Sequence, residues 1–447
     1  MFQKVLIANR GEIAVRIIQA CRDLGIISVA VYSEADREAL HAQIADEAVC
    51  IGPARAADSY LNMDNIISAA LASGCQAIHP GFGFLSENPD FAERITQAGL
   101  AFIGPTAATI RLMGDKSEAK RNAIAAGVPV ALGTDGPLRD FDEAISEAER
   151  IGYPVMLKAA SGGGGKGIRV AESVKDLKDA YDSAAAEAIA NFGDGRLYME
   201  KYIHNPRHIE VQILGDNYGN VVHLFERECS VQRRHQKLIE ESPSAFVTPE
   251  LREKMTSAAV ALAKRVGYRN AGTIEFLVDN DRNFYFCEMN TRIQVEHPVT
   301  EEVTGVDLVC EQLRVAAGEA LSFRQEDLVI RGHAIECRIN AEDPSRNFAP
   351  CPGTLVSLHL PGGPGVRVDS AAYQGYKIPP FYDSMIGKLI VYGADREQAI
   401  VRMRRALAEM LFEGVVTATD YQMHILCSKA FVEANFNVNS IANGDFD

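Results

Sequence analysis

Glu275 to Glu296 reads E-F-L-V-D-N-D-R-N-F-Y-F-C-E-M-N-T-R-I-Q-V-E, and this stretch decides the fold around it. The segments Gly272 to Val278 and Phe284 to Glu288 are rich in β-forming side chains. Between them, the polar run Asp279 to Asn283 has the composition of a turn. The pattern therefore predicts a β-hairpin.

The register of this hairpin places acidic side chains opposite one another. A symmetrical hairpin with a four-residue loop, 280–283, pairs Val278 with Tyr285, Phe276 with Cys287 and Glu275 with Glu288. Directly opposed carboxylates repel each other on a sheet. A hard divalent cation held between Glu275 and Glu288 is the simplest explanation, with Asn290 adding a third oxygen from the same face. Mg²⁺ that keeps some of its waters and bridges nucleotide phosphates fits this ligand set best.

The second strand is expected to continue past the proposed metal ligands. Arg292, Gln294 and Glu296 alternate on one side before Pro298 ends the extended run. An ordinary half-buried hairpin with a solvated polar face is the alternative. That alternative leaves unexplained why six polar or charged side chains share one face of otherwise apolar strands.

Composition limits the class of protein. A chain of 447 residues is long enough for two to four domains, and its 47% hydrophobic content is typical of a globular protein. No apolar run is long enough to cross a membrane, and Val5 to Ala8 is too short for a secretory signal, so we expect a cytoplasmic protein. A net charge of −15 argues against nucleic acid as a partner, so an anionic substrate must meet a local cluster of positive charge.

The nine cysteines are scattered and form no C-x-x-C pair. This spacing suggests neither a disulfide framework nor a zinc site. Cys229 stands beside a basic, polar run and is either a reactive thiol or a buried spectator, and we expect the second.

The order of the patterns divides the chain into three modules. Strand-like Lys4 to Ala8 and Ile27 to Tyr32 enclose a helical stretch, Ile13 to Leu24, which predicts a βαβ opening. The turn lacks G-x-G-x-x-G, so this Rossmann-like module has no supported dinucleotide site. It closes near residue 113. A second module follows from the helical stretch after Lys116, and a third begins near Arg331 with the strand-like segment 333–339.

A glycine-rich loop in the second module suits phosphate binding. The strand-like segment 153–158 runs into S-G-G-G-G-K-G at 161–167, and bare backbone amides can close over phosphates. It is not a Walker loop, because Ala160 stands where the first glycine is needed and Gly167 follows Lys166. We expect a flap that covers a nucleotide, with a plain surface hairpin as the alternative.

Cationic and strand-edge residues surround this loop in the predicted fold. Lys116, Lys158 and Lys166 supply ammonium groups, and Glu200 to Ile203 has the look of a strand edge able to read an adenine. The run Gln232 to Lys237 is the densest basic patch in an acidic protein. Beside a predicted Mg²⁺ site, phosphate or bicarbonate binding explains that patch better than a solvated face.

Taken in order, these pieces resemble the biotin carboxylases of the ATP-grasp superfamily. The resemblance runs from Lys4 to about Gly414. Its motifs are N-R-G-E-I-A at 9–14, H-P-G-F-G-F-L-S-E-N at 79–88, M-G-D-K at 113–116, S-G-G-G-G-K-G at 161–167, E-C-S-V-Q-R-R-H-Q-K at 228–237, E-M-N-T-R-I-Q-V-E-H at 288–297 and Y-D-S-M-I-G-K-L-I at 382–390.

The resemblance implies a fold that combines α/β and α+β parts. It implies a Rossmann-like N-terminal (pre-ATP-grasp) domain at 1–113, an ATP-grasp domain at 114–330 with a mobile Gly-rich lid at about 131–203, and a mixed α+β C-terminal domain at 331–447. It also implies a ligase in which ATP activates bicarbonate as carboxyphosphate. The carboxyl group then passes to biotin carried on a separate protein.

The resemblance assigns a role to each matching position. For ATP it implies Lys116, Lys158, Gly164, Gly165, Glu200, Lys201, Tyr202, Ile203, His208, Gln232, His235 and Leu277, together with Glu275 and Glu288. For two Mg²⁺ or Mn²⁺ ions it implies Glu275, Glu288 and Asn290. For bicarbonate it implies Lys237, Arg292, Gln294 and the Val295 backbone, with Glu296 as general base and Arg338 on the biotin ureido oxygen. Bicarbonate must lose a proton as it attacks the γ-phosphate, which is why a carboxylate is needed there.

The chain departs from the family pattern at four places. Phe82 stands where Tyr is usual, Lys166 where Arg is common and Ile168 where Met is frequent, and these changes are expected to tune ATP affinity. The segment 414–420 replaces G-x-x-T-N, which puts the C-terminal packing and any partner contact there in doubt. Residues 421–447 have no sequence-based placement.

Two other functions compete with this one. A carbamoyl-phosphate or amino-acid ligase of the ATP-grasp type does not explain the third module with Arg338. A non-catalytic nucleotide-binding homologue is expected to lose at least one of Glu275, Glu288, Arg292, Glu296 and Arg338, and this chain has all five.

The partners follow from the same resemblance. It implies a biotin carboxyl carrier protein, carboxyltransferase subunits and a homodimer, with no nucleic acid and no membrane. The first half-reaction of acetyl-CoA carboxylase, in fatty acid synthesis, is the leading expectation, with another acyl-CoA or pyruvate carboxylase as the alternative. No Met-Lys pair occurs in the sequence, and little sequence follows Gly414, so we expect no biotin on this chain.

Overall fold

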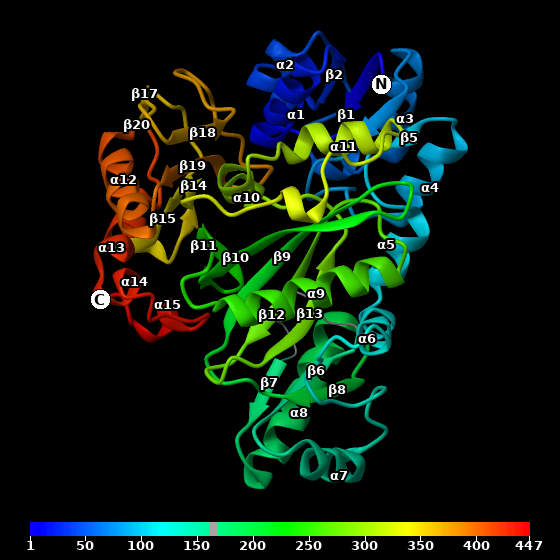
Figure 1. Cartoon of the computed structure of the whole chain (residues 1–447), viewed down its shortest axis with the longest axis vertical. Coiled ribbons are helices and arrows are strands. Elements are labelled where there is room, and N and C mark those ends of the chain that lie inside the picture. The colour runs from blue at the N-terminus through cyan, green and yellow to red at the C-terminus, as the bar shows by residue number, and fades with distance from the viewer. Residues whose placement is uncertain (161–167) are drawn as a thin grey trace.

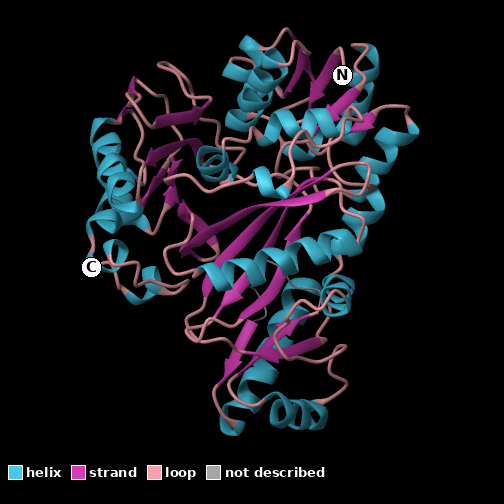
Figure 2. Ribbon diagram, viewed as in Figure 1, coloured by secondary structure: helices cyan, strands magenta, loops and turns pink. Residues whose placement is uncertain are grey.

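The computed structural model describes residues 1–160 and 168–447. Three parts surround a long central sheet, with the N-terminal part at the upper right of Figure 1, the C-terminal part at the left and a small α/β part at the lower end. Figure 2 shows the same division by secondary structure, with the central strands flanked by helices. None of the described helices is both long and apolar enough to span a lipid bilayer.

The N-terminal part is a five-stranded parallel sheet in the order β3-β2-β1-β4-β5. This is a doubly wound order, so the expected Rossmann-like architecture is confirmed. Val5, Leu6 and Ile7 are fully buried, as continuous apolar strands covered on both faces require. Its elements are β1 (Lys4–Ile7), α1 (Gly11–Asp23), β2 (Ile27–Tyr32), α2 (Leu40–Ile44), β3 (Glu47–Cys50), α3 (Met63–Ala72), β4 (Ala77–His79), α4 (Pro89–Gln97), β5 (Ala101–Phe102) and α5 (Ala107–Gly114).

The central sheet has eight antiparallel strands in the order β13-β12-β9-β10-β11-β14-β19-β18. Thr248 caps α9 by accepting a hydrogen bond from the Leu251 amide, as its sequence position predicts. The elements of the middle part are α6 (Lys116–Ala125), β9 (Arg207–Gly215), β10 (Val221–Arg233), β11 (Gln236–Ser242), α9 (Pro249–Arg265), β12 (Asn270–Val278), β13 (Phe284–Asn290), α10 (His297–Thr304) and α11 (Leu308–Ala316).

The sheet crosses from the second predicted module into the third. The strand expected at 333–339 is β14 (His333–Asn340), and it pairs with β11 on one side and β19 (Met385–Gly393) on the other. β18 (Val366–Ser370) completes the edge beside β19. The two modules therefore share one hydrogen-bonded sheet.

The small part at the lower end has its own three-stranded sheet, β7-β6-β8, and its own apolar core. Asp140 caps the first of its helices, as its spacing predicts. Its elements are α7 (Phe141–Ile151), β6 (Val155–Ala159), β7 (Ile168–Ala171), α8 (Val174–Phe192) and β8 (Leu197–Lys201). The glycine loop predicted at 161–167 lies outside the described residues.

The C-terminal segment that the sequence left unplaced packs into the core of the third part. Phe431, Phe436 and Phe446 are all buried in the cluster formed by β14, β19 and α12. Arg207 of β9 lies over the Phe436 ring, which ties this segment to the central sheet. The remaining elements are β15 (Glu342–Asp343), β16 (Ala349–Pro350), β17 (Ser357–His359), α12 (Arg396–Glu409), β20 (Leu411–Glu413), α13 (Thr419–Cys427), α14 (Lys429–Val432) and α15 (Ser440–Asn443).

Candidate active site

The predicted hairpin is formed by β12 and β13, and Glu275 lies opposite Glu288, as the sequence indicated. Nearer the turn the predicted register is wrong. The pairs there are Val278 with Phe284, Leu277 with Tyr285 and Phe276 with Phe286, and the register shifts between Glu275 and Phe276. Five residues form the loop and Cys287 is the extra residue of a β-bulge. The bulge restores the facing glutamates.

The predicted continuation of the second strand is also wrong. β13 ends at Asn290, and Glu296 is the N-cap of α10, with Pro298 in the first helical turn. Proline is well placed there, because the first turn of a helix has no use for its missing N–H. Arg292, Gln294 and Glu296 therefore lie on a connection between a strand and a helix. This connection still brings Arg292, Gln294 and Glu296 to one site.

Glu275 is the hub of the candidate metal site. Its Oε1 accepts hydrogen bonds from Asn290 Nδ2 at 2.9 Å and Gln294 Nε2 at 2.8 Å, and lies 3.1 Å from Lys237 Nζ. Its Oε2 lies 3.1 Å from His208 Nε2. Burial alone raises the pKa of this carboxyl, but Lys237 and His208 outweigh it and hold the pKa well below its usual value.

The pKa of Glu288, which faces Glu275, shifts in the opposite direction. Its side chain reaches solvent, and partial desolvation followed by repulsion from Glu275 raises its pKa. Asn290 Oδ1 accepts from Arg292 Nη2 at 3.0 Å. Glu275, Glu288 and Asn290 thus bring the carboxylate and amide oxygens that Mg²⁺ prefers onto one end of the hairpin, which fits the expected metal.

Glu296 lies between two cations. Its Oε1 is 2.5 Å from Lys237 Nζ and its Oε2 accepts from Arg338 Nη2 at 2.9 Å. Burial raises the pKa of Glu296, but the two cations outweigh burial and lower it well below its usual value. Glu296 is therefore ionised at neutral pH.

Arg338 is in turn oriented by a second carboxylate. Its Nε donates to Glu240 Oε1 at 2.6 Å, while Nη1 has no hydrogen-bond partner within the described ranges. A buried guanidinium held on one side by two carboxylates can offer its third nitrogen to an oxygen of a ligand. This geometry suits the ureido oxygen that the sequence assigned to it.

Arg292 is held by the N-terminal part. Its Nε donates to Glu87 Oε2 at 2.8 Å, and the Thr291 amide donates to Glu87 Oε1 at 3.0 Å. Glu87 comes from the loop before α4, more than two hundred residues away in sequence. The site is therefore assembled from two parts of the fold.

Three family models match consecutive parts of the chain. The biotin carboxylase N-terminal domain matches residues 1–110, the ATP-binding domain of the carbamoyl-phosphate synthase L chain matches 115–324, and the biotin carboxylase C-terminal domain matches 336–443. Biotin carboxylase 1 of Bacillus subtilis (strain 168) is 56% identical over 446 residues, covering 100% of this chain and 99% of the relative. The chain belongs to the biotin carboxylase family.

Further relatives of this biotin carboxylase chain come from different carboxylases. A pyruvate carboxylase subunit of Methanothermobacter thermautotrophicus is 57% identical, covering 96% of this chain and 88% of that relative. Among solved structures, the biotin carboxylase domain of the Hydrogenobacter thermophilus 2-oxoglutarate carboxylase superposes with a TM-score of 0.94 at 51% identity, covering 100% of this chain and 99% of that domain. That structure is a dimer in complex with MgADP, ADP and bicarbonate. Its fold confirms the expected fold class.

Several of the residues expected to bind ATP lie on or beside the edge strand β8. Lys158 Nζ lies 2.5 Å from Glu200 Oε2, and Lys120 Nζ lies 3.6 Å from Glu200 Oε1. Lys201 donates to the carbonyl oxygens of Gly152 and Tyr153, and Tyr202 and Ile203 follow directly. Lys116 is the first residue of α6. The predicted flap residues Gly164 and Gly165 lie outside the described residues.

The other expected nucleotide contacts lie on the central sheet. His208 Nδ1 of β9 lies 3.5 Å from Gln232 Nε2 of β10. Leu277 of β12 is the strand partner of His208. His235 is at the exposed tip of the hairpin between β10 and β11, with a positive φ of 65°. The Cys229 thiol nearby is fully buried, and burial raises its pKa well above the usual value, so Cys229 is a spectator and not a reactive thiol.

Four residues of the site were missed by sequence reasoning: Glu87, Glu210, Arg227 and Lys388. Arg227 is fully buried and donates to Gln212 Oε1 at 2.7 Å, Gln294 Oε1 at 2.8 Å and Glu210. Glu210 Oε2 accepts from Lys237 at 2.7 Å. Two signals were available: charged residues within otherwise apolar strands, E-V-Q at 210–212 and E-R-E-C at 226–229, and the family motifs at 79–88 and 382–390, which contain Glu87 and Lys388.

Proposed function

We propose that this protein carboxylates biotin on a separate carrier protein, using ATP, Mg²⁺ and bicarbonate through carboxyphosphate. One observation carries the proposal: Glu296 is held between Lys237 and Arg338 at hydrogen-bond distance, beside a hairpin that presents Glu275, Glu288 and Asn290. A base, two anion-binding cations and a metal-ligand set are the groups that this chemistry requires.

Bicarbonate binding gives a role to the ion pair between Lys237 and Glu296. Lys237, Arg292, Gln294 and the Val295 backbone bind the anion, and Lys237 is then drawn from Glu296 toward it. Losing this cation raises the pKa of Glu296, so the carboxylate becomes a stronger base when its substrate arrives. Glu296 accepts the bicarbonate proton while a bicarbonate oxygen attacks the γ-phosphorus and ADP leaves.

ATP is bound between the central sheet and the small lower part. Lys116 and Lys158 neutralise the phosphates. Gly164 and Gly165, which lie outside the described residues, stay predicted phosphate contacts. The adenine lies against Glu200, Lys201, Tyr202 and Ile203, with His208, Gln232, His235 and Leu277 as further contacts. Mg²⁺ held by Glu275, Glu288 and Asn290 supplies charge neutralisation on the phosphate oxygens.

The second half of the reaction belongs to Arg338. Its Nη1 donates to the biotin ureido oxygen and stabilises the negative charge that develops there as N1′ loses its proton. N1′ then takes up the carboxyl group of carboxyphosphate, and inorganic phosphate leaves with the proton. A biotin carboxyl carrier protein delivers the biotin and carboxyltransferase subunits consume the product.

The assembly and the final acceptor belong to the same proposal. We assign domains at 1–113, 114–330 and 331–447, a homodimer, a cytoplasmic location and the first half-reaction of acetyl-CoA carboxylase in fatty acid synthesis. A keto acid acceptor is the second candidate, because relatives at 57% and 51% identity belong to a pyruvate and a 2-oxoglutarate carboxylase. Assaying the purified chain with each candidate carrier and transferase pair, and following which acceptor is carboxylated, distinguishes them.

The deciding experiment is ATP hydrolysis by the purified chain with bicarbonate and free biotin. We expect turnover that needs both. Turnover that needs an amino acid or ammonia in place of biotin indicates a different ATP-grasp ligase. Nucleotide binding without turnover indicates a non-catalytic homologue.

The metal assignment has its own test. A nucleotide-bound structure is expected to hold the Glu275 and Glu288 carboxylates within about 8 Å of each other, since Mg²⁺ ligands lie roughly 2 Å from the ion. We expect Glu288→Gln to raise the Mg²⁺ concentration needed for half-maximal turnover. A wild-type metal requirement in that variant would remove Glu288 from the ligand set.

A further inference from the structure

A completely buried lysine touches the backbone next to the general base. Lys388 on β19 has no exposed surface, and its Nζ donates to the Val295 carbonyl oxygen at 2.9 Å. Lysine is almost never fully buried without a specific reason, because removing an ammonium group from water is costly. Val295 directly precedes Glu296 on the connection between β13 and α10.

The carbonyl that Lys388 holds controls where Glu296 points. The Val295 carbonyl and the Glu296 amide belong to one planar peptide group. A charge-assisted hydrogen bond to that oxygen fixes the orientation of the plane and therefore the direction in which the Glu296 side chain leaves the backbone. Glu296 is the N-cap residue of α10, so its backbone lies where the connection turns into the helix.

The ammonium group also lies near two carboxylates, one from the N-terminal part and one from the neighbouring strand β18. Glu12 Oε2, in the first turn of α1, lies 3.3 Å from Lys388 Nζ, and Asp369 Oδ2 on β18 lies at 3.9 Å. Lys388 is paired across the sheet with Arg338 on one side and Asp369 on the other. The lysine therefore joins the N-terminal part, the central sheet and the general base.

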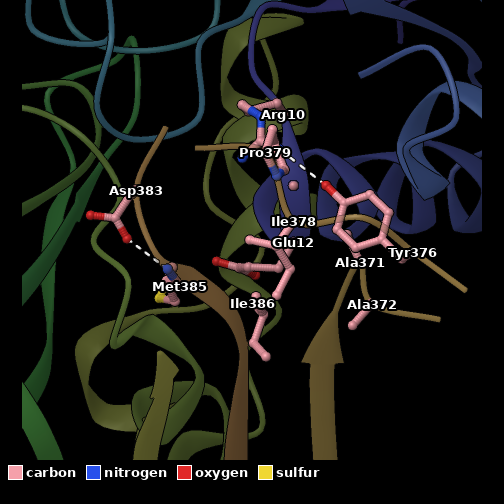
Figure 3. Close-up of a pocket in the computed structure, with 11 residues that line it drawn as sticks. Arg10, Glu12, Ala371, Ala372, Tyr376, Ile378, Pro379, Asp383, Met385 and Ile386 are labelled. Atoms are coloured by element: carbon pink, nitrogen blue, oxygen red, sulfur yellow. Dashed lines mark hydrogen bonds between the residues drawn. The ribbon is translucent and has the colours of Figure 1, made fainter. Parts of the chain in front are cut away.

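The contact with Lys388 is the main feature that accounts for the burial of Glu12. It is 5% exposed, and within the described chain neither carboxylate oxygen has a hydrogen-bond partner besides the ion-pair contact with Lys388. It lines a cavity of about 20 Å³. In Figure 3 it lies between Tyr376 on one side and Asp383 and Met385 on the other. Burial raises the pKa of Glu12 to about 7 despite the nearby ammonium.

We propose that Lys388 is a positioning residue for the general base Glu296, acting through the Val295 carbonyl, and that Glu12 holds the ammonium group in place. The proposal rests on the function given above. A purely structural role, in which Lys388 only neutralises Glu12, is the competing explanation. The two explanations differ in what happens when both charges are removed together.

The test compares Lys388→Met, Glu12→Gln and the double variant. We expect Lys388→Met to lower the kcat of bicarbonate-dependent ATP hydrolysis by about 10- to 100-fold, the loss typical of a misplaced reacting group. The KM for ATP should change less than about threefold. The double variant removes the unpaired buried carboxylate and should regain melting temperature, while kcat stays as low as in Lys388→Met. Wild-type kcat in the double variant would overturn the proposal.

A double-mutant cycle with Glu296→Gln gives the second readout. If Lys388 acts through Glu296, adding Lys388→Met to Glu296→Gln should lower the remaining turnover by less than about threefold, because the two losses are then not additive. Additive losses would mean that Lys388 acts elsewhere.

Arg396→Met provides the matched stability control. Arg396 of α12 forms a part-buried ion pair at 2.7 Å with Glu241 of β11, whose side chain points to the opposite face of the strand from Glu240 and Arg338. This variant should lose melting temperature while kcat per folded enzyme is unchanged. The proposed function fails if the wild-type protein shows no bicarbonate-dependent turnover. If the wild-type protein turns over and Lys388→Met has the same kcat, only the positioning role fails.

Discussion

As the proposed base, Glu296 would be kept ionised and weakly basic until bicarbonate binds. Two cations satisfy both of its oxygens in the ligand-free arrangement, and its lowered pKa makes it a weak base there. An anion that competes for Lys237 reverses both effects. The proton acceptor is thus strengthened by the same event that delivers the proton.

Replacing Glu296 by Gln keeps the shape and removes the base. We expect bicarbonate-dependent turnover to fall by about 10²-fold or more, as for a positioned acid–base group. ATP affinity, measured by nucleotide titration, should be nearly unchanged. Wild-type turnover in this variant would contradict the assignment.

Glu87 offers a second change at the residue scale. It orients Arg292 and the Thr291 amide from the N-terminal part. We expect Glu87→Gln to raise the KM for bicarbonate by about tenfold, because a charge-assisted hydrogen bond to the anion-binding arginine is weakened. Glu93→Gln is the control, since Glu93 contacts Arg111 in an exposed ion pair, and its KM for bicarbonate should stay at the wild-type value.

β11 shows how one strand serves two environments. Successive residues of a strand point to opposite faces. Glu240 contacts Arg338 at the site, and burial followed by repulsion from Glu296 brings its pKa to about 7, despite the opposing effect of Arg338. Glu241 meets Arg396 and His333 on the other face, and these partners outweigh burial and lower its pKa to about 2. β11 therefore contributes Glu240 to the candidate site on one face and Glu241 to a structural ion pair on the other.

The lowered pKa of Glu241 predicts a pH dependence of stability. Its ionised form is favoured in the folded state, so its contribution is present above the unfolded pKa near 4.5 and is lost as pH falls toward 2. Urea unfolding at pH 5.5 and 3.5 measures this loss. We expect the drop in unfolding free energy between these pH values to be about 1 kcal/mol smaller in Glu241→Gln than in the wild-type protein. Equal drops in both proteins would show that another group dominates.

Local patterns predicted the elements well and the site incompletely. Alternation and turn composition were sufficient for the hairpin and for the facing pair Glu275 and Glu288. They could not reveal the bulge at Cys287, because a single extra residue changes the register without changing the pattern. The extended run through Gln294 was wrong because alternation over a few residues does not distinguish a strand from an irregular connection.

Glu12, Glu87 and Lys388 stand inside the family motifs at 9–14, 79–88 and 382–390, but the sequence did not show which residues they contact. Glu87, Lys388 and Glu12 approach the site from other parts of the chain, and only the fold brings them together. The roles of the metal, bicarbonate and biotin residues came from the family resemblance and from the chemistry of the donor groups. The hydrophobic pattern alone does not indicate which ligand a residue binds.

At the scale of the whole molecule, we expect the biotin to come from another protein. Biotinyl domains present their lysine in a Met-Lys-Met type of hairpin tip, and no Met-Lys pair occurs in the 447 residues. We expect the purified chain, expressed with a biotin ligase, to give no 48.7 kDa band with labelled streptavidin. A carrier protein on the same blot is the positive control, and a labelled band from this chain would contradict the expectation.

The eight-stranded sheet has a consequence for how the molecule loses structure. β11 pairs with β10 on one side and with β14 on the other, so a single ladder of hydrogen bonds passes beneath Lys237, Glu296 and Arg338. Opening β14 on its own would expose the polar edge of β11 to water, and such openings are therefore rare. We therefore expect the amide hydrogens of β10, β11 and β14 to exchange with solvent together, in one cooperative unit, and those of the separate sheet β7-β6-β8 to exchange independently.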